Sequence, residues 1–186
     1  MIEPQVTNGT RIVFGPCRLS YTHVFEKFIP EGETDGKYQT NILIPKSEKK
    51  TLKAINEAIA EAKKKAITEK WSGKEPKKLD MPLRDGDEKD DEVYEDHFYL
   101  NAKSKKRPGI VNRQKEAILD EDEVYSGCWA IVSVTFYGYD TSGNRGVGCA
   151  LNNIMKWKDD EALGGGNVGA DVDFADVSAE DEDEDL

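Results

Sequence analysis

Tyrosines and basic residues carry the clearest chemistry in this chain, and several recur at strand spacing. The densest run of β-branched and aromatic residues is 126–139, where Tyr137 and Tyr139 fall on one face and Val134 and Phe136 on the other. Rings stack on nucleobases and cations neutralise phosphates, so such a face can hold one nucleic-acid strand whatever its sequence. The pattern predicts a binding surface for single-stranded nucleic acid.

The candidate DNA-binding residues are five tyrosines and nine basic side chains drawn from several predicted strands. They are Tyr21, Tyr38, Tyr99, Tyr137 and Tyr139, with Arg18, Lys37, Lys103, Lys105, Lys106, Arg107, Arg113, Arg145 and Lys156. The alternative role for each ring is core packing, which is less favoured for tyrosine because its hydroxyl needs a polar partner.

Catalytic and metal-binding chemistry finds little support. The two histidines, His23 and His97, have no metal-ligand neighbour at useful spacing, and there is no Cys-x-x-Cys pair and no glycine-rich phosphate loop. The acidic run 85–92 has Asp90 at the sixth position, where a calcium loop needs glycine. We expect no catalytic residue, metal or cofactor, and so no enzyme; a metal-dependent nuclease is the less favoured alternative.

Two acidic segments dominate the formal charge of −11. Residues 164–186 hold nine carboxylates and no Lys or Arg, and residues 80–96 hold nine carboxylates against Arg84 and Lys89. Without these segments the remaining chain carries +5, so a mildly basic body is expected to bear two detachable acidic segments. The competing hypothesis is an acidic interaction protein or DNA mimic, whose carboxylate runs would be ordered.

The expected elements place the candidate residues on a small barrel. Strands are predicted at residues 11–24, 37–44, 97–103, 126–139 and 145–157, with a short segment at 110–111. An amphipathic helix with Ser47 as its N-cap is predicted at 48–70, and a long polar loop at 71–96. The fold expected is mainly β: a five-stranded OB-fold-like barrel (the oligonucleotide-binding type) plugged by one helix.

The predicted domains are a nucleic-acid-binding domain at 1–163 and a disordered acidic tail at 164–186, since a segment of single-sign charge buries too little surface to fold. The three cysteines, Cys17, Cys128 and Cys149, are interpreted as reduced core thiols. The sequence shows neither a membrane span nor a secretion signal, so a cytoplasmic protein is expected. The end of the tail is the predicted partner-binding segment: Asp181, Glu182, Asp183, Glu184, Asp185 and Leu186.

Four stretches resemble a family of tailed-phage proteins related to phage single-stranded DNA-binding proteins. They are residues 18–25, 37–46, 100–108 (beginning Leu-Asn-Ala-Lys-Ser) and 125–153 (including Tyr-Gly-Tyr-Asp and Leu-Asn-Asn). The resemblance implies an OB-fold, sequence-independent binding of single-stranded DNA, and a role in phage DNA replication or recombination inside the host bacterium. Replication or recombination proteins would then be partners of the tail, although tails of this type often end in an aromatic and this one ends in Leu186. Whether the chain forms a homodimer stays open.

Overall fold

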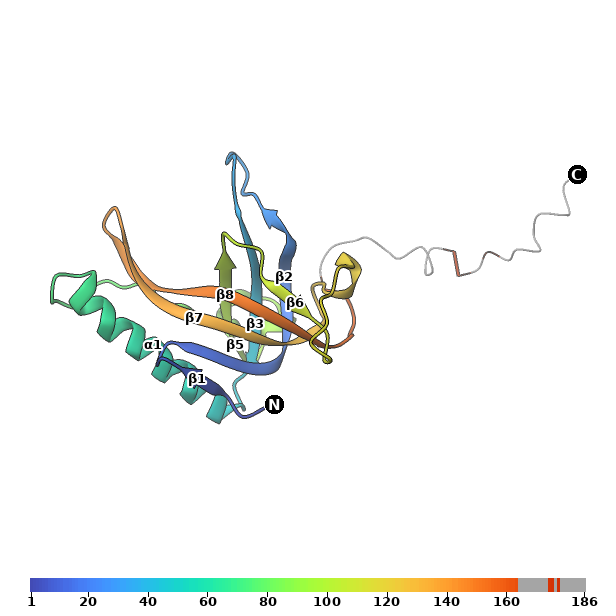
Figure 1. The fold of residues 1–186 in the computed structure, drawn as a ribbon, viewed down its shortest axis with the longest axis horizontal. Helices are drawn as coiled ribbons and strands as arrows, with labels where there is room; N and C mark the ends of the chain where they lie inside the picture. The colour runs from blue at the N-terminus through green and yellow to red at the C-terminus, as the bar shows by residue number, and fades with distance from the viewer. Residues whose placement is uncertain (164–173, 176, 178–186) are drawn as a thin grey trace, which may run out of the picture.

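The computed structural model describes residues 1–163, 174–175 and 177, and Figure 1 shows a twisted barrel with one helix packed along it. The long strands are β2 (Arg11–Phe28), β3 (Lys37–Pro45), β5 (His97–Ser104), β7 (Trp129–Thr141) and β8 (Asn144–Lys158). The short ones are β1 (Gln5–Thr7), β4 (Leu83–Asp85) and β6 (Gly109–Val111). The helix is α1 (Lys49–Glu69), and three 3₁₀ turns lie at η1 (Gly86–Lys89), η2 (Glu92–Tyr94) and η3 (Glu121–Glu123).

The five long strands close on themselves. Their order is β5-β3-β2-β7-β8, and a parallel pairing of Lys103 on β5 with Ala150 on β8 completes the ring. The short strands β1, β4 and β6 pair at its margins. The predicted five-stranded OB-fold-like barrel with one helix is confirmed, whereas the predicted tail at 164–186 falls almost entirely outside the described residues.

Alternation along the strands separates a core from an outer face. On β3, Thr40, Ile42 and Ile44 are fully buried inside the barrel, while Lys37 and Gln39 face outward. Strand β2 is irregular at Gly15-Pro16, where its pairing with β7 shifts register between Phe14 and Cys17. All three cysteines are buried in or beside this core.

Helix α1 covers one side of the barrel with the apolar stripe predicted from its sequence. Leu52, Ile55, Ile59, Ala62 and Ala66 are all buried, and the helix packs mainly on β7. The prediction of Ser47 as N-cap is wrong. Glu48 holds that position without a side-chain cap, because backbone bonds from Glu48 to Pro45 and from Lys49 to Ser47 already form the entry turn. No helix in the described part of the chain is long and apolar enough to cross a bilayer.

The prediction of a long polar loop at 71–96 is wrong for its second half. Residues 83–94 form β4, η1 and η2, and β4 adds to the edge of β5. Tyr94 is fully buried and anchors the segment on the barrel. The acidic segment 80–96 is therefore part of the folded body and is not detachable. Counting charges could not predict this outcome, because a charge count does not register the burial of Tyr94.

Candidate nucleic-acid interface

A groove crosses the outer face of β3 and β5, between two projecting hairpins. Its floor carries Lys37 and Gln39 from β3 and Asn101 and Lys103 from β5. One wall is the β2–β3 connection, residues 28–36, and the other is the β7–β8 hairpin; both hairpins stand out from the barrel in Figure 1. Two adjoining pockets, of about 540 and 390 Å³, share three of the floor residues and so form one continuous trough.

The β7–β8 wall presents two tyrosine rings to the trough. Tyr137 is 44% exposed, and its ring lies 6.4 Å from that of Tyr139, centroid to centroid. Across the ladder Tyr137 pairs with Gly148 and Tyr139 with Gly146. A Cβ at Gly148 would lie 2.5 Å from the Tyr137 ring, so only glycine lets that ring lie flat against β8.

Both rings stay uncharged at neutral pH. Burial raises the pKa of the Tyr137 hydroxyl, and burial together with the nearby Asp80 carboxylate raises the pKa of Tyr139. The Tyr139 hydroxyl donates a hydrogen bond to Asp80, at 3.2 Å. Neutral rings beside a phosphate chain add stacking without charge repulsion.

Positive charge in the trough is largely unpaired. Within the described residues no carboxylate lies in salt-bridge range of Lys37, Lys103 or Lys105. Two of the carboxylates that line the trough are engaged elsewhere: Asp35 meets Lys27 at 3.3 Å, and Asp80 meets Arg84 at 3.5 Å. Glu33, on the 28–36 wall, has no ion-pair partner among the described residues. The Gly36 amide and Lys27 hold the pKa of Asp35 below its usual value. The floor can therefore neutralise phosphates.

The acidic segment covers the other half of the same sheet face. The amine of Lys89 lies over three rings, 4.8 Å from Tyr21, 4.6 Å from Tyr94 and 5.2 Å from Tyr99, measured to the ring centroids. Tyr94 also accepts a hydrogen bond from the amide of Asn41 on β3, at 2.8 Å. Tyr21 and Tyr99, both predicted to contact DNA, thus surround a lysine of this chain.

Lys46, at the end of β3, holds the start of this segment. Its amine bridges Asp85 at 2.7 Å and Asp87 at 2.6 Å, which raises the pKa of Lys46 to about 12 and lowers the pKa of both carboxyls. Asp87 also accepts from the backbone amide of Asp96, which ties the two ends of the segment together. The first residues of the segment, 80–84, still contribute to the lining of the trough, whereas residues 85–96 do not.

Comparison with known proteins identifies the family. The family model described as "Enterobacter phage Enc34, ssDNA-binding protein" matches residues 10–186. This chain belongs to that family. Protein p50 of Acyrthosiphon pisum secondary endosymbiont phage 1 is 34% identical over 184 residues, which cover 94% of this chain and 97% of p50.

Solved structures share the fold. The single-stranded DNA-binding protein of bacteriophage Enc34 in complex with ssDNA superposes with a TM-score of 0.76 at 24% identity, covering 87% of this chain and 94% of that one. The single-stranded DNA-binding protein gp2.5 of bacteriophage T7 gives a TM-score of 0.59 at 17% identity, covering 91% and 95%. The barrel of this Enc34-family chain is thus shared by proteins whose sequences have diverged widely.

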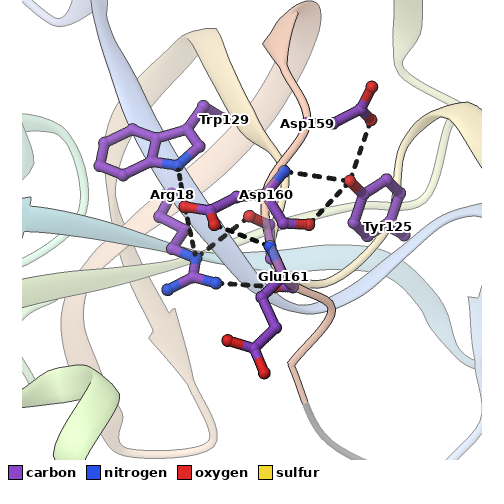
Figure 2. A network of polar contacts seen from close by, with 7 residues as sticks. Arg18, Tyr125, Trp129, Asp159, Asp160 and Glu161 are labelled. Atoms are coloured by element: carbon purple, nitrogen blue, oxygen red, sulfur yellow. Dashed lines mark hydrogen bonds and ion pairs between the residues drawn. The ribbon is translucent and has the colours of Figure 1, made fainter.

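Three of the predicted DNA contacts lie at the far end of the β7–β8 ladder, away from the trough. Arg18 donates to the Glu161 carbonyl at 2.7 Å and faces Asp160 at 3.9 Å. Trp129 donates to the same Asp160 carboxylate (Figure 2). Lys156 bridges Glu123 and Asp159, both at 2.8 Å. Arg113 stacks on the Trp157 ring, 3.8 Å from its centroid. These cations hold the chain where it leaves the barrel, and we do not assign them to the groove.

The other predicted residues divide between the groove and its surroundings. Lys37, Lys103, Lys105, Tyr137 and Tyr139 line the trough, and Arg145 lies at the hairpin end, paired with Asp140 at 2.9 Å. Tyr38 shares the core-facing side of β3 and is half-buried. Lys106 and Arg107 follow β5, with Arg107 over the Phe25 ring. The predicted tail residues 181–186 lie outside the described residues.

Sequence reasoning missed Arg84, Phe28 and Asn101. Arg84 was hidden in the segment interpreted as loop, and Phe28 lies beyond the predicted end of the first strand. Asn101 could have been found, since it alternates with Tyr99 and Lys103 on the outward side of β5. Counting only rings and cations left this amide out.

Proposed function

We propose that this chain binds single-stranded DNA without sequence preference, in the trough across β3 and β5. The observation that carries the proposal is that Lys37, Lys103 and Lys105, which have no carboxylate partner among the described residues, line one trough with the neutral rings of Tyr137 and Tyr139. Membership of the Enc34 ssDNA-binding protein family supports it, as does the fold shared with a protein solved in complex with ssDNA.

Phosphates and bases would use different parts of the trough. Lys37, Lys103 and Lys105 neutralise the backbone, and Tyr137 and Tyr139 stack on bases at roughly 1–3 kcal/mol each. The strand runs across β3 and β5 from the 28–36 connection to the β7–β8 hairpin. The acidic segment repels phosphates at the other side and confines the strand to this path.

We assign the protein to phage DNA replication or recombination in the host cytoplasm, with the acidic tail 164–186 as a partner-binding segment and 1–163 as the binding domain. A flexible linker of about 20 residues spans roughly 25 Å, whereas a body of about 160 residues has a radius of gyration near 15 Å. The tail therefore reaches the trough, where tethering gives it a roughly millimolar effective concentration. It competes with DNA at low salt and is released to partners when DNA binds.

The test is anisotropy of a labelled thymidine oligomer, titrated against a salt series and against a duplex of equal length. Each neutralised phosphate contributes about −0.7 to the log–log salt slope for a single strand. Lys103→Gln and Lys37→Gln should each reduce the magnitude of that slope by about 0.7. Lys53→Gln, on the exposed side of α1, is the matched control and should leave it unchanged. Equal affinity for the duplex, or slopes unmoved by the groove variants, would refute the proposal.

The second candidate, an acidic DNA mimic, is favoured by one observation: the acidic segment 80–96 is ordered. Its carboxylates Asp85 and Asp87 are bound to Lys46, however, and the trough lysines carry no carboxylate partner among the described residues. Retention of the full chain on a thymidine-oligomer column separates the two, because a mimic passes through. A nuclease would instead degrade labelled substrate when magnesium is added.

A further inference from the structure

Phe28 places an aromatic ring on the wall of the trough that faces away from the tyrosines. It is the last residue of β2, is 39% exposed, and lines the larger pocket, of about 540 Å³. The tyrosine rings of the β7–β8 wall line the other pocket, and Lys37 and Lys103 line both. The trough therefore has exposed rings on both walls, with cations on the floor that the two pockets share.

The Phe28 ring is held in position by its neighbours. It packs against the imidazole ring of His23, with 5.0 Å between ring centroids and 41° between ring planes. Its backbone pairs with Lys37 across the β2–β3 ladder, which fixes the ring beside a cation of the floor. A Cβ at Gly36 would collide with the Phe28 carbonyl, so glycine lets the returning chain pass close to this residue. A ring already held in this way loses little freedom when a ligand stacks on it.

Charges on the same wall decide which part of a DNA strand suits this ring. Glu33 and Asp35 line the pocket beside Phe28, whereas its lysines come from β3 and from β5 and its end. A phosphate against this wall would be repelled by two carboxylates, but a nucleobase is uncharged and has a face that can stack on a phenyl ring. The wall therefore suits a base, and the floor suits the phosphates.

We propose that Phe28 stacks on a base, so that the trough holds one strand by bases at both walls and by phosphates across the floor. This inference rests on the proposed function and deepens it, because it adds a second stacking site and a requirement for length. Only a strand that reaches both walls uses both sites. In a duplex each base lies between its stacked neighbours, so neither ring finds a free base without unstacking.

The experiment measures binding of the full-length protein to thymidine oligomers of increasing length, up to about 16 nucleotides, the upper end of the range for one OB-fold. Phe28→Ala is expected to bind the long oligomers roughly 5- to 150-fold more weakly, the range for loss of one stacked base. The shortest oligomers that bind measurably reach one wall at a time. They still find the tyrosine wall, so their affinity should fall by no more than about twofold.

Matched variants separate stacking from a structural role. Phe28→Tyr keeps the ring and should bind within about twofold of the wild type at every length. Ile29→Ala, at the exposed next position and outside both pockets, should leave affinity unchanged. Phe28→Ala should also keep the salt slope of the wild type, because it removes no cation. Should that variant fail to fold, Phe28→Leu, which keeps apolar bulk without a ring, takes its place.

The outcomes also separate this inference from the proposed function. Wild-type affinity of Phe28→Ala for long oligomers, alongside weakened binding by Tyr137→Ala, would overturn the role of Phe28 alone. An equal loss at every oligomer length would overturn it too, since that pattern means a damaged wall and not a lost stacking site. Failure of the unmodified protein to bind any oligomer at low salt would refute the proposed function itself.

Discussion

At the scale of single residues, the positions of the Tyr137 and Tyr139 rings depend on the residues opposite them on β8. Tyr137 and Tyr139 face Gly148 and Gly146 across the ladder, and the glycines leave space in which the rings lie against β8. The ring of Tyr137 is therefore held in place before DNA arrives, so little side-chain entropy is lost on stacking.

Tyr137→Ala is expected to weaken binding of a thymidine oligomer by 1–3 kcal/mol, roughly 5- to 150-fold, through loss of one stacked base. Tyr137→Phe, which keeps the ring, should bind within about twofold of the wild type. Anisotropy titration at fixed salt measures both. A Phe variant as weak as the Ala variant would mean that the hydroxyl, and not stacking, carries the contact.

Residue spacing predicted much of this wall but could not predict which cations are available. The alternation along 126–139 placed both tyrosines on one outward face. Arg18 and Lys156 look equivalent to Lys103 in sequence. In the structure, however, Arg18 faces Asp160, and Lys156 pairs with Glu123 and with Asp159 just beyond the end of β8. Whether a basic side chain is free to contact DNA therefore depends on the tertiary structure.

At the scale of elements, the long strands and the helix follow from periodicity, whereas the acidic segment does not. Its composition is that of a solvated loop, and a single buried ring, Tyr94, with its bond to Asn41 reverses that expectation. The segment converts an open sheet face into a trough with one closed side.

Lys46→Met is expected to loosen the acidic segment without unfolding the barrel. Exposed ion pairs contribute little to global stability, so the thermal midpoint should barely move. Amide hydrogen exchange at residues 85–96 should accelerate because both Asp85 and Asp87 lose their partner. Lys50→Met, which breaks the exposed pair with Glu3, is the matched control and should leave exchange in this segment unchanged. Equal exchange rates in both variants would mean that Lys46 does not hold the acidic segment in place.

The ion pairs of Lys46 with Asp85 and Asp87 predict the pH range over which the acidic segment stays in place. The pKa values of Asp85 and Asp87 are lowered, so their contribution is full above the ordinary aspartate value of about 3.9 and is lost as the pH falls through the lower folded values. The pKa of Lys46 is raised, so its contribution is full below 10.5 and is lost as the pH rises through about 12. Near-ultraviolet circular dichroism of the tyrosines around Lys89 should stay constant from pH 5 to 9, which lies inside these limits and below the range in which tyrosine ionises. A change between pH 5 and 9 would contradict this assignment.

At the scale of the whole molecule, the formal charge of −11 hides a basic trough. The chain is held at 159–161 by Arg18, Tyr125 and Trp129 (Figure 2), and Lys156 also pairs with Asp159, so the last described residues of the barrel are fixed in place.

Truncation after Gly166 is expected to raise affinity for single-stranded DNA at low salt, because the competing carboxylates are removed. The gain should shrink as salt increases, since screening weakens the tail and the DNA alike. A tail with its carboxylates replaced by amides should behave as the truncation does. Unchanged affinity at low salt would rule out self-shielding.

We propose that single-stranded DNA lies in the trough between the two hairpins. Ultraviolet crosslinking of a thymidine oligomer to the full chain, with crosslinked residues identified by mass spectrometry, tests it most directly. Crosslinks are expected at Tyr137, Tyr139 and Phe28, all of which line the trough. Crosslinks concentrated at Trp129 and Trp157, at the far end of the β7–β8 ladder, would contradict it.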